Sequence, residues 1–153
     1  MRLLALDIGE VRIGVAVCDT LEIAAFPIGT VQRVGNLKRD VTAVADIAME
    51  QEAEAIVAGL PLSLNGEIGP QAKRIQGFVQ ALKRAVNLPI VYWDESLTSV
   101  DAEEIMLAQG ASRAKRRAMI DQMAAVLLLD SYLTHRRNTN APRESLQIDE
   151  YHL

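Results

Sequence analysis

The chain has 153 residues, of which 50% are hydrophobic and 24% are charged, which predicts one globular domain with a full-sized core. Its net charge of −4 and pI near 5.2 exclude a nucleic-acid-binding protein that is basic overall, so any binding of nucleic acid must use a local basic patch. No apolar run approaches the roughly 20 residues of a membrane helix. The single Cys18 excludes an internal disulfide, and Asp7 interrupts any N-terminal signal pattern, so we expect a cytoplasmic protein without a membrane partner.

The first predicted elements are strands. The apolar run at 3–6 fits a strand covered on both faces, and Asp7 stands at its end. After Gly9 and a short loop, large and small apolar residues alternate over 13–18, which predicts the second strand of a hairpin. A third strand is expected within "AAFPIGTVQR", where Pro27 indicates a sheet edge or a bulge.

Helices and strands alternate in the rest of the chain. Amphipathic helices are predicted at 37–53 and at 70–86, the latter starting at Pro70, and each precedes or follows a short apolar strand. The strands are 54–61 and 88–95, and two further helices cover about 98–108 and 112–134. This order predicts a mixed α/β sheet with helices on its faces. Residues 135–153 are polar and aperiodic, which predicts a flexible C-terminal tail.

Carboxylates stand at the ends of two of the predicted strands. Asp7 ends the first strand, while Asp94 and Glu95 end the strand at 88–95. In open α/β sheets, function gathers at the carboxyl ends of parallel strands. If both strands are central and parallel, these carboxylates project at one edge, where like charges raise each other's pKa unless a cation sits between them.

A third carboxylate interrupts the apolar face of the last predicted helix. Asp121 shares this face with the apolar residues of "MIDQMAAVLLLDSYL", namely Ala124, Ala125, Leu128 and Tyr132. The small alanines would let the helix approach the sheet and bring Asp121 towards the other acids. Three carboxylates without a nearby His or Cys form an all-oxygen ligand set, which selects Mg²⁺ or Mn²⁺ over zinc and can hold two ions for phosphodiester cleavage.

Each of these charged groups also has a plain structural interpretation. Asp94 could stand at the start of a helix in "SLTSVDAEE", and Asp121 could pair with Arg117 one turn earlier. The basic run in "SRAKRRAM" is either a phosphate-binding surface or a solvated helix face. Its members are Arg113, Lys115, Arg116 and Arg117.

Four segments together resemble the YqgF proteins, also called RuvX, which are described as Holliday junction resolvases of the RNase H-like superfamily. The segments are "ALDIGEVRIGVAVCD", "GLPLSLNGEIGPQAKRIQGF", "WDESLTSVDAEE" and "SRAKRRAMIDQMAAVLLLDSYL". They occur in the family's order and span positions 5 to 133. The resemblance implies an RNase H-like nuclease domain over residues 1–134. Its sheet would be a mixed five-stranded one, with three antiparallel strands plus two parallel strands and flanking helices.

The same resemblance implies a divalent-metal nuclease site. By motif, Asp7 matches the acid of the first strand, Glu95 the acid of the family's "DER" segment, and Asp121 the acid of its "DxxAA" helix. These residues would be both catalytic and metal-binding, with Mg²⁺ or Mn²⁺ as cofactor and Asp94 as a weaker candidate ligand. The implied activity is that of a metal-dependent endonuclease acting on structured RNA or branched DNA. The preferred role is maturation of the 5′ end of the small-subunit ribosomal RNA precursor.

The sequence departs from the family pattern at Ser96, where the family usually has an arginine that would be a natural phosphate contact. Arg12 and Arg117 are candidates to replace it, and Arg12 joins the basic run as an expected nucleic-acid contact. In the "GLPLSLNG" loop, Asn65 and Gly66 could offer backbone N–H groups to a phosphate or form a plain turn.

Two other functions remain open from the sequence. A Holliday junction resolvase would be expected to form a homodimer, because it acts on two strands. A non-catalytic module would bind nucleic acid through the basic run, or a nucleotide through "DIGEVRIGVAV", which resembles the phosphate-binding turn of actin-like sugar kinases. Those kinases clamp the nucleotide between two such domains, and this chain has room for one.

Overall fold

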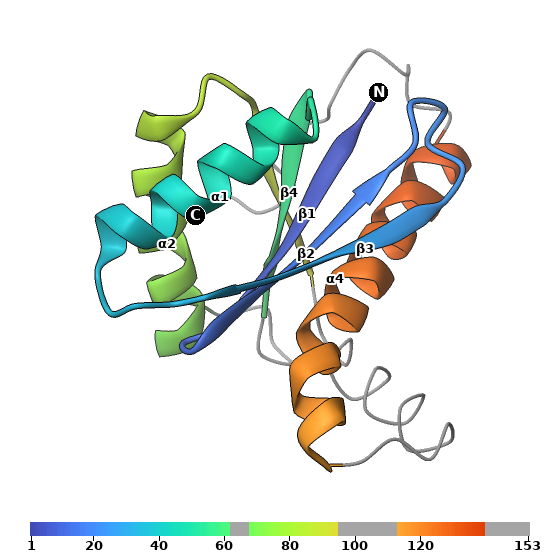
Figure 1. Ribbon diagram of the computed structural model, residues 1–153. Coiled ribbons are helices and arrows are strands. Elements are labelled where there is room, and N and C mark those ends of the chain that lie inside the picture. The colour runs from blue at the N-terminus through green and yellow to red at the C-terminus, as the bar shows by residue number, and fades with distance from the viewer. Residues whose placement is uncertain (62–67, 95–112, 140–153) are drawn as a thin grey trace.

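Five strands form one mixed sheet in the order β3-β2-β1-β4-β5 (Figure 1). The computed structural model describes residues 1–61, 68–94 and 113–139, except for the side chains of residues 113–119 and Asp121. β2 is antiparallel to β1 and to β3, whereas β4 is parallel to β1 and to β5, which confirms the predicted sheet. The strands are β1 (Leu3–Ile8), β2 (Arg12–Cys18), β3 (Ala25–Gln32), β4 (Ala55–Leu60) and β5 (Ile90–Asp94).

The β1–β2 hairpin requires a glycine at its turn. The N–H of Gly9 donates a 2.9 Å hydrogen bond to the carbonyl of Arg12, and a Cβ at position 9 would lie 2.7 Å from that same oxygen. Real Cβ atoms essentially never approach a backbone oxygen so closely. Gly9 therefore lets the chain reverse tightly, two residues after Asp7.

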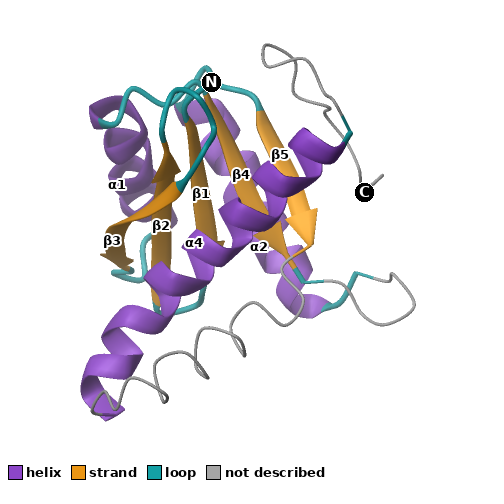
Figure 2. Ribbon diagram, turned by 90° about the vertical axis from the view of Figure 1, so that its right-hand side faces the viewer, coloured by secondary structure: helices purple, strands orange, loops and turns teal. Residues whose placement is uncertain are grey.

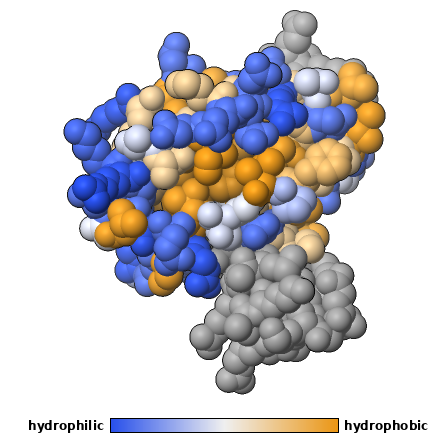
Figure 3. All heavy atoms as spheres, viewed as in Figure 1, coloured by the Kyte–Doolittle hydropathy of each residue, from blue (hydrophilic) through white to orange (hydrophobic). Residues whose placement is uncertain are grey.

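β3 is an edge strand with a bulge, as Pro27 predicted. Val15 pairs with Gly29 and Ala16 pairs with Pro27, so Ile28 is the extra residue. Phe26 and Ile28 of this strand are exposed, and Figure 3 shows hydrophobic surface gathered at the middle of the face that Figure 1 turns towards the viewer. Proline and a bulge protect such an edge against pairing with another strand.

Helices cover both faces of the sheet. Figure 1 shows α1 (Leu37–Glu50) and α2 (Pro70–Ala85) on one face and α4 (Arg113–Asn138) on the other. Alternate residues of β1 enter the two cores, so that Leu4 and Leu6 pack with α1 and α2, while Leu3 and Ala5 pack with α4. Asn36 caps the start of α1, because its side chain accepts the N–H of Arg39, and α2 begins at Pro70 as predicted.

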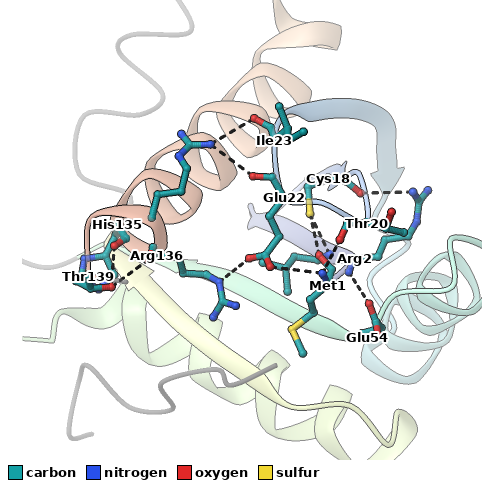
Figure 4. A network of polar contacts seen from close by, with 12 residues as sticks. Met1, Arg2, Cys18, Thr20, Glu22, Ile23, Glu54, His135, Arg136 and Thr139 are labelled. Atoms are coloured by element: carbon teal, nitrogen blue, oxygen red, sulfur yellow. Dashed lines mark hydrogen bonds and ion pairs between the residues drawn. The ribbon is translucent and has the colours of Figure 1, made fainter. Parts of the chain in front are cut away.

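The C-terminal helix is longer than the sequence predicts. The sequence predicts a tail from His135 onward, but α4 continues through Asn138, and Arg136 is only 5% exposed. The cause is tertiary, because Arg136 forms a buried ion pair with Glu22 from the turn between β2 and β3 (Figure 4). The helix predicted at about 98–108 and the tail over 140–153 lie outside the described residues. Within the part of the chain that is described, no helix is long and apolar enough to cross a membrane.

Candidate functional site

Asp7 lies at the carboxyl end of β1 with only 8% of its surface exposed. Alternate residues of a strand point to the same face, so Asp7 shares the face of Leu3 and Ala5, which is the face that α4 covers. Its partner on β2 is Gly14, and on β4 the register of Leu6 opposite Ala58 puts Gly59 at the next level. Both neighbouring strands therefore place a glycine, which has no side chain, at the level of Asp7.

Asp7 and Asp94 lie at the carboxyl ends of parallel strands that finish at the same edge of the sheet, as predicted, although β5 is an outer strand of the sheet and not a central one. Both β1 and β5 run parallel to β4, which separates them, and Asp94 is the last residue of β5. However, Asp94 is two residues after Tyr92 in β5, so the two side chains point to the same face of the sheet. Tyr92 packs towards α1 and α2, and burial there raises the pKa of its phenol. Asp94 therefore belongs to the face opposite that of Asp7.

The predicted docking face of α4 is confirmed. Ala124, Ala125, Leu128 and Tyr132 are all buried. Position 121 lies one helical turn before Ala125 in the same helix, and Figure 2 shows α4 crossing the sheet diagonally. The side chain of Asp121 itself lies outside what the structure describes.

Arg12 is described and begins β2 at the edge of Asp7, but the remaining predicted site residues fall outside the described part of the chain in whole or in part. Glu95 and Ser96 lie beyond the last described residue of β5, and Asn65 and Gly66 lie between the described ranges that end at 61 and begin at 68. The side chains of the basic run at the start of α4 are likewise not described, namely those of Arg113, Lys115, Arg116 and Arg117. Among the side chains that are described, no three carboxylate, imidazole or thiol groups gather to hold a metal ion, and Asp7 is the only predicted catalytic acid in that set.

Two residues that the sequence interpretation missed support the turn after Asp7. Arg33, which follows β3, donates from Nη1 to the carbonyl of Gly9 at 3.0 Å, and its backbone N–H donates to Val11 at 2.9 Å. Its Nε donates to Asp40 Oδ2 at 3.0 Å, and its guanidinium lies 5.1 Å from the ring centre of Phe78. α1 and α2 thus hold the turn through a single arginine.

A sequence signal for this support did exist. Asp40 lies on the apolar face of α1, next to Val41 and one turn before Val44, and an acid in that position is out of pattern. In the structure Asp40 is 2% exposed and also accepts the N–H of Val34 at 3.0 Å. The buried acid therefore marks an ion pair that fixes the start of α1.

Cavities lie at both edges of the sheet. A small groove at the edge of Asp7 is lined by Gly9, Glu10, Arg33, Gln71 and Arg74, and an exposed ion pair of 2.9 Å joins Arg74 to Glu10. A larger cavity of about 530 Å³ lies between the C-terminal ends of α1 and α2. Its lining includes residues that precede β4 and β5, so this cavity is at the opposite edge, away from the carboxylates.

Comparisons with known proteins agree with this arrangement. The family model described as "RuvX: Holliday junction resolvase" matches residues 1–135. A relative from Thermoanaerobacter pseudethanolicus, named "Putative pre-16S rRNA nuclease", is 41% identical over 139 residues, which cover 90% of this chain and 99% of the relative. A relative of the same name from Clostridium kluyveri is 44% identical over 87% of this chain and 96% of its own length.

Among solved structures, one described as "T. thermophilus RuvC in complex with Holliday junction substrate" matches with a TM-score of 0.56. The match covers 91% of this chain and 97% of that chain at 17% identity, so it establishes a shared fold. The RuvC-like sheet, the buried acid at the end of β1 and the family match over residues 1–135 lead to one assignment. The chain belongs to the RuvX family.

Proposed function

We propose that the protein is a divalent-metal-dependent endonuclease that matures the 5′ end of the small-subunit ribosomal RNA precursor. The observation that carries the proposal is Asp7, a buried carboxylate between two glycines at the carboxyl edge of a RuvC-like sheet. The names of relatives that are about 40% identical over nearly their whole length support the substrate. Such a substrate implies an activity in the cytoplasm.

The chemistry of Asp7 fits a hard divalent cation. A carboxylate that is 8% exposed loses most of its hydration, and this loss must be offset by a cation or by hydrogen bonds. We propose Mg²⁺ or Mn²⁺ as the cofactor, held by the oxygen atoms of Asp7, Glu95 and Asp121. When bound, such ions lower the pKa of a water molecule and stabilise the leaving oxygen.

The pleat of β5 favours Glu95 over Asp94 as the second acid. Val91 and Trp93 belong to the face of Asp7, whereas Ile90, Tyr92 and therefore Asp94 have the opposite parity. The family motif implies Glu95, the next residue in the sequence, as the acid after β5. We therefore propose Glu95 as the ligand, with Asp121 approaching from α4.

We propose that the arginines around this edge contact the phosphates of the substrate. Arg12 begins β2 at this edge, and the basic run of Arg113, Lys115, Arg116 and Arg117 begins α4. Replacing Arg116 with alanine should weaken binding for all sequences alike. It should also reduce the slope of log K, where K is the binding constant, against log salt concentration by about 0.7 to 0.9, which is the change expected for the loss of one phosphate contact.

The test of the proposed function is cleavage of a precursor transcript with Mg²⁺ or Mn²⁺ by wild type and by Asp7→Asn. We expect the wild type to cut at the 5′ end of the mature RNA and the variant to lose the activity. Asp46→Asn is the matched control, because Asp46 is an exposed acid that lines the cavity at the opposite edge. Equal cutting by wild type and Asp7→Asn would contradict the assignment.

A four-way DNA junction belongs in the same assay, because the family description names that substrate. Paired, Asp7-dependent cuts in opposite strands, made by a homodimer, would assign the protein as a resolvase instead. Cutting of the RNA precursor with the junction left intact would support the ribosomal role.

A further inference from the structure

Trp93, the single tryptophan of the chain, lies on the same face of the sheet as Asp7. It is opposite Gly59 in the register of β4 and β5, and Gly59 is at the level of Asp7 in the register of β1 and β4. The two residues are therefore two strand spacings apart, about 10 Å between backbones. The β4 residue between them is a glycine, so β4 itself places no side chain between the indole and the carboxylate at this level.

The indole ring is held in a fixed orientation by one turn of α4. Trp93 Nε1 donates a 3.1 Å hydrogen bond to Ser131 Oγ. The ring meets Tyr132 edge-on, with centres 5.4 Å apart and planes at 72°, and it lies 4.7 Å from the ring of His135. Trp93 packs against the core under α4 but remains partly exposed, so α4 orients the ring without burying it completely.

We propose that Trp93 is a stacking platform for an unpaired base of the nucleic-acid strand whose cleaved bond lies at the proposed metal site of Asp7. This proposal rests on the proposed nuclease function and adds the form of the substrate. Aromatic side chains bind single-stranded nucleic acid by stacking, which every base accepts because every base has a π face. A base inside a duplex already stacks on its neighbours, so the platform selects strands that are open next to the cleaved bond.

A packing role alone explains the arrangement less well. A tryptophan that only filled the core would be buried like Tyr132, which is 2% exposed on the same face. Trp93 instead stands at the level of the acid, at the edge where β1, β4 and β5 end. Its hydrogen bond to Ser131 and its ring contacts prepare one orientation in advance, which lowers the entropy lost on binding.

The first test uses Trp93 as its own reporter. The full-length Asp7→Asn protein, which leaves the substrate uncut, is titrated with a mixed-sequence single-stranded RNA of about 16 nucleotides while tryptophan fluorescence is recorded. We expect the fluorescence to be quenched as the RNA binds. The same sequence as a blunt duplex should bind with much less quenching.

The second test locates the stacked base. Abasic nucleotides are placed at successive positions of the RNA, and binding is measured for the Asp7→Asn parent and for the same protein carrying Trp93→Phe or Trp93→Leu. Trp93→Leu should bind the intact RNA about 5- to 150-fold more weakly, whereas Trp93→Phe should retain much of the affinity. One abasic position should weaken the parent but leave Trp93→Leu unchanged, because the stacking partner is already missing.

The matched control is Tyr92→Leu, which removes an aromatic ring from the opposite face of the same strand. It should leave RNA affinity and quenching unchanged. Thermal unfolding of each variant separates a loss of binding from a loss of folding, and Trp93→Phe keeps the test valid if Trp93→Leu does not fold.

The outcomes distinguish the platform from the nuclease assignment. RNA binding without quenching, together with equal abasic penalties in the parent and in the Trp93 variants, overturns the platform but leaves Asp7-dependent cleavage standing. Loss of cleavage dependence on Asp7, with quenching retained, overturns the nuclease and keeps a stacking site. No RNA binding at all overturns both.

Discussion

Arg136 Nε donates a 2.6 Å hydrogen bond to Glu22 Oε1 and joins the last turns of α4 to the turn between β2 and β3 (Figure 4). The pair is buried, with side-chain exposures of 5% and 9%, and Glu22 has a φ of 58°, a left-handed value that costs a glutamate about 1–2 kcal/mol. The terminal amine of Met1 also lies 3.4 Å from Glu22 Oε2. This contact gives α4 a fixed end.

Removing the charge of Glu22 should destabilise the protein. We expect Glu22→Gln to lower the free energy of unfolding by about 3 kcal/mol, because Arg136 would remain buried without its anion. Urea unfolding measures the change, and Lys83→Met, which removes an exposed positive charge from α2, should stay within about 0.5 kcal/mol of wild type. The double variant Glu22→Gln/Arg136→Met should lose less unfolding free energy than the sum of the losses in the two single variants. A loss equal to that sum would contradict the pairing.

Two glycines should respond in opposite directions to alanine. Gly9→Ala should cost about 1–3 kcal/mol of stability, because the new Cβ would lie 2.7 Å from the carbonyl oxygen of Arg12. Gly77→Ala, within α2, meets no atom inside 4 Å and should stabilise the protein by about 0.5–1 kcal/mol. Thermal unfolding of both variants tests this, and a stable Gly9→Ala protein would show that the tight turn is dispensable.

Asp40 should matter for stability far more than other acids of α1. Asp40→Ala removes the acceptor of Arg33 Nε and of the Val34 N–H, which should cost about 1–3 kcal/mol. Asp46→Asn, an exposed change on the same helix, should change stability by less than about 0.5 kcal/mol. Chemical denaturation provides the comparison, and similar values for the two variants would mean that Arg33 finds another partner.

The thiol of Cys18 should make stability depend on pH in the alkaline range. Burial raises the pKa of Cys18 above its ordinary value of 9.0, so the unfolded chain loses this proton first as the pH rises. The stabilising contribution is therefore complete below pH 9.0 and is lost as the pH rises through the folded-state pKa. Urea unfolding below and above pH 9.0 should show a larger loss for wild type than for Cys18→Ala, and parallel losses would exclude this linkage.

The patterns of the sequence were sufficient for most of the fold. Alternation over β2, the apolar runs of β1, β4 and β5, and the start of α2 at Pro70 are all local signals, and the structure agrees with each. The C-terminal end of α4 was predicted too early. Its polar sequence gives no apolar periodicity, and only the distant Glu22 makes Arg136 a buried residue.

The candidate site divides in the same way. The sequence by itself determined that Asp7 ends a buried strand, because hydrophobic runs and a carboxylate are visible without a partner. Only the tertiary structure decided which groups share its face, because strand register and pleat depend on pairing between distant segments. Strand register places Gly14, Gly59 and Trp93 at the level of Asp7. Asp94 points to the opposite face of the sheet, because successive residues of a strand point to opposite faces.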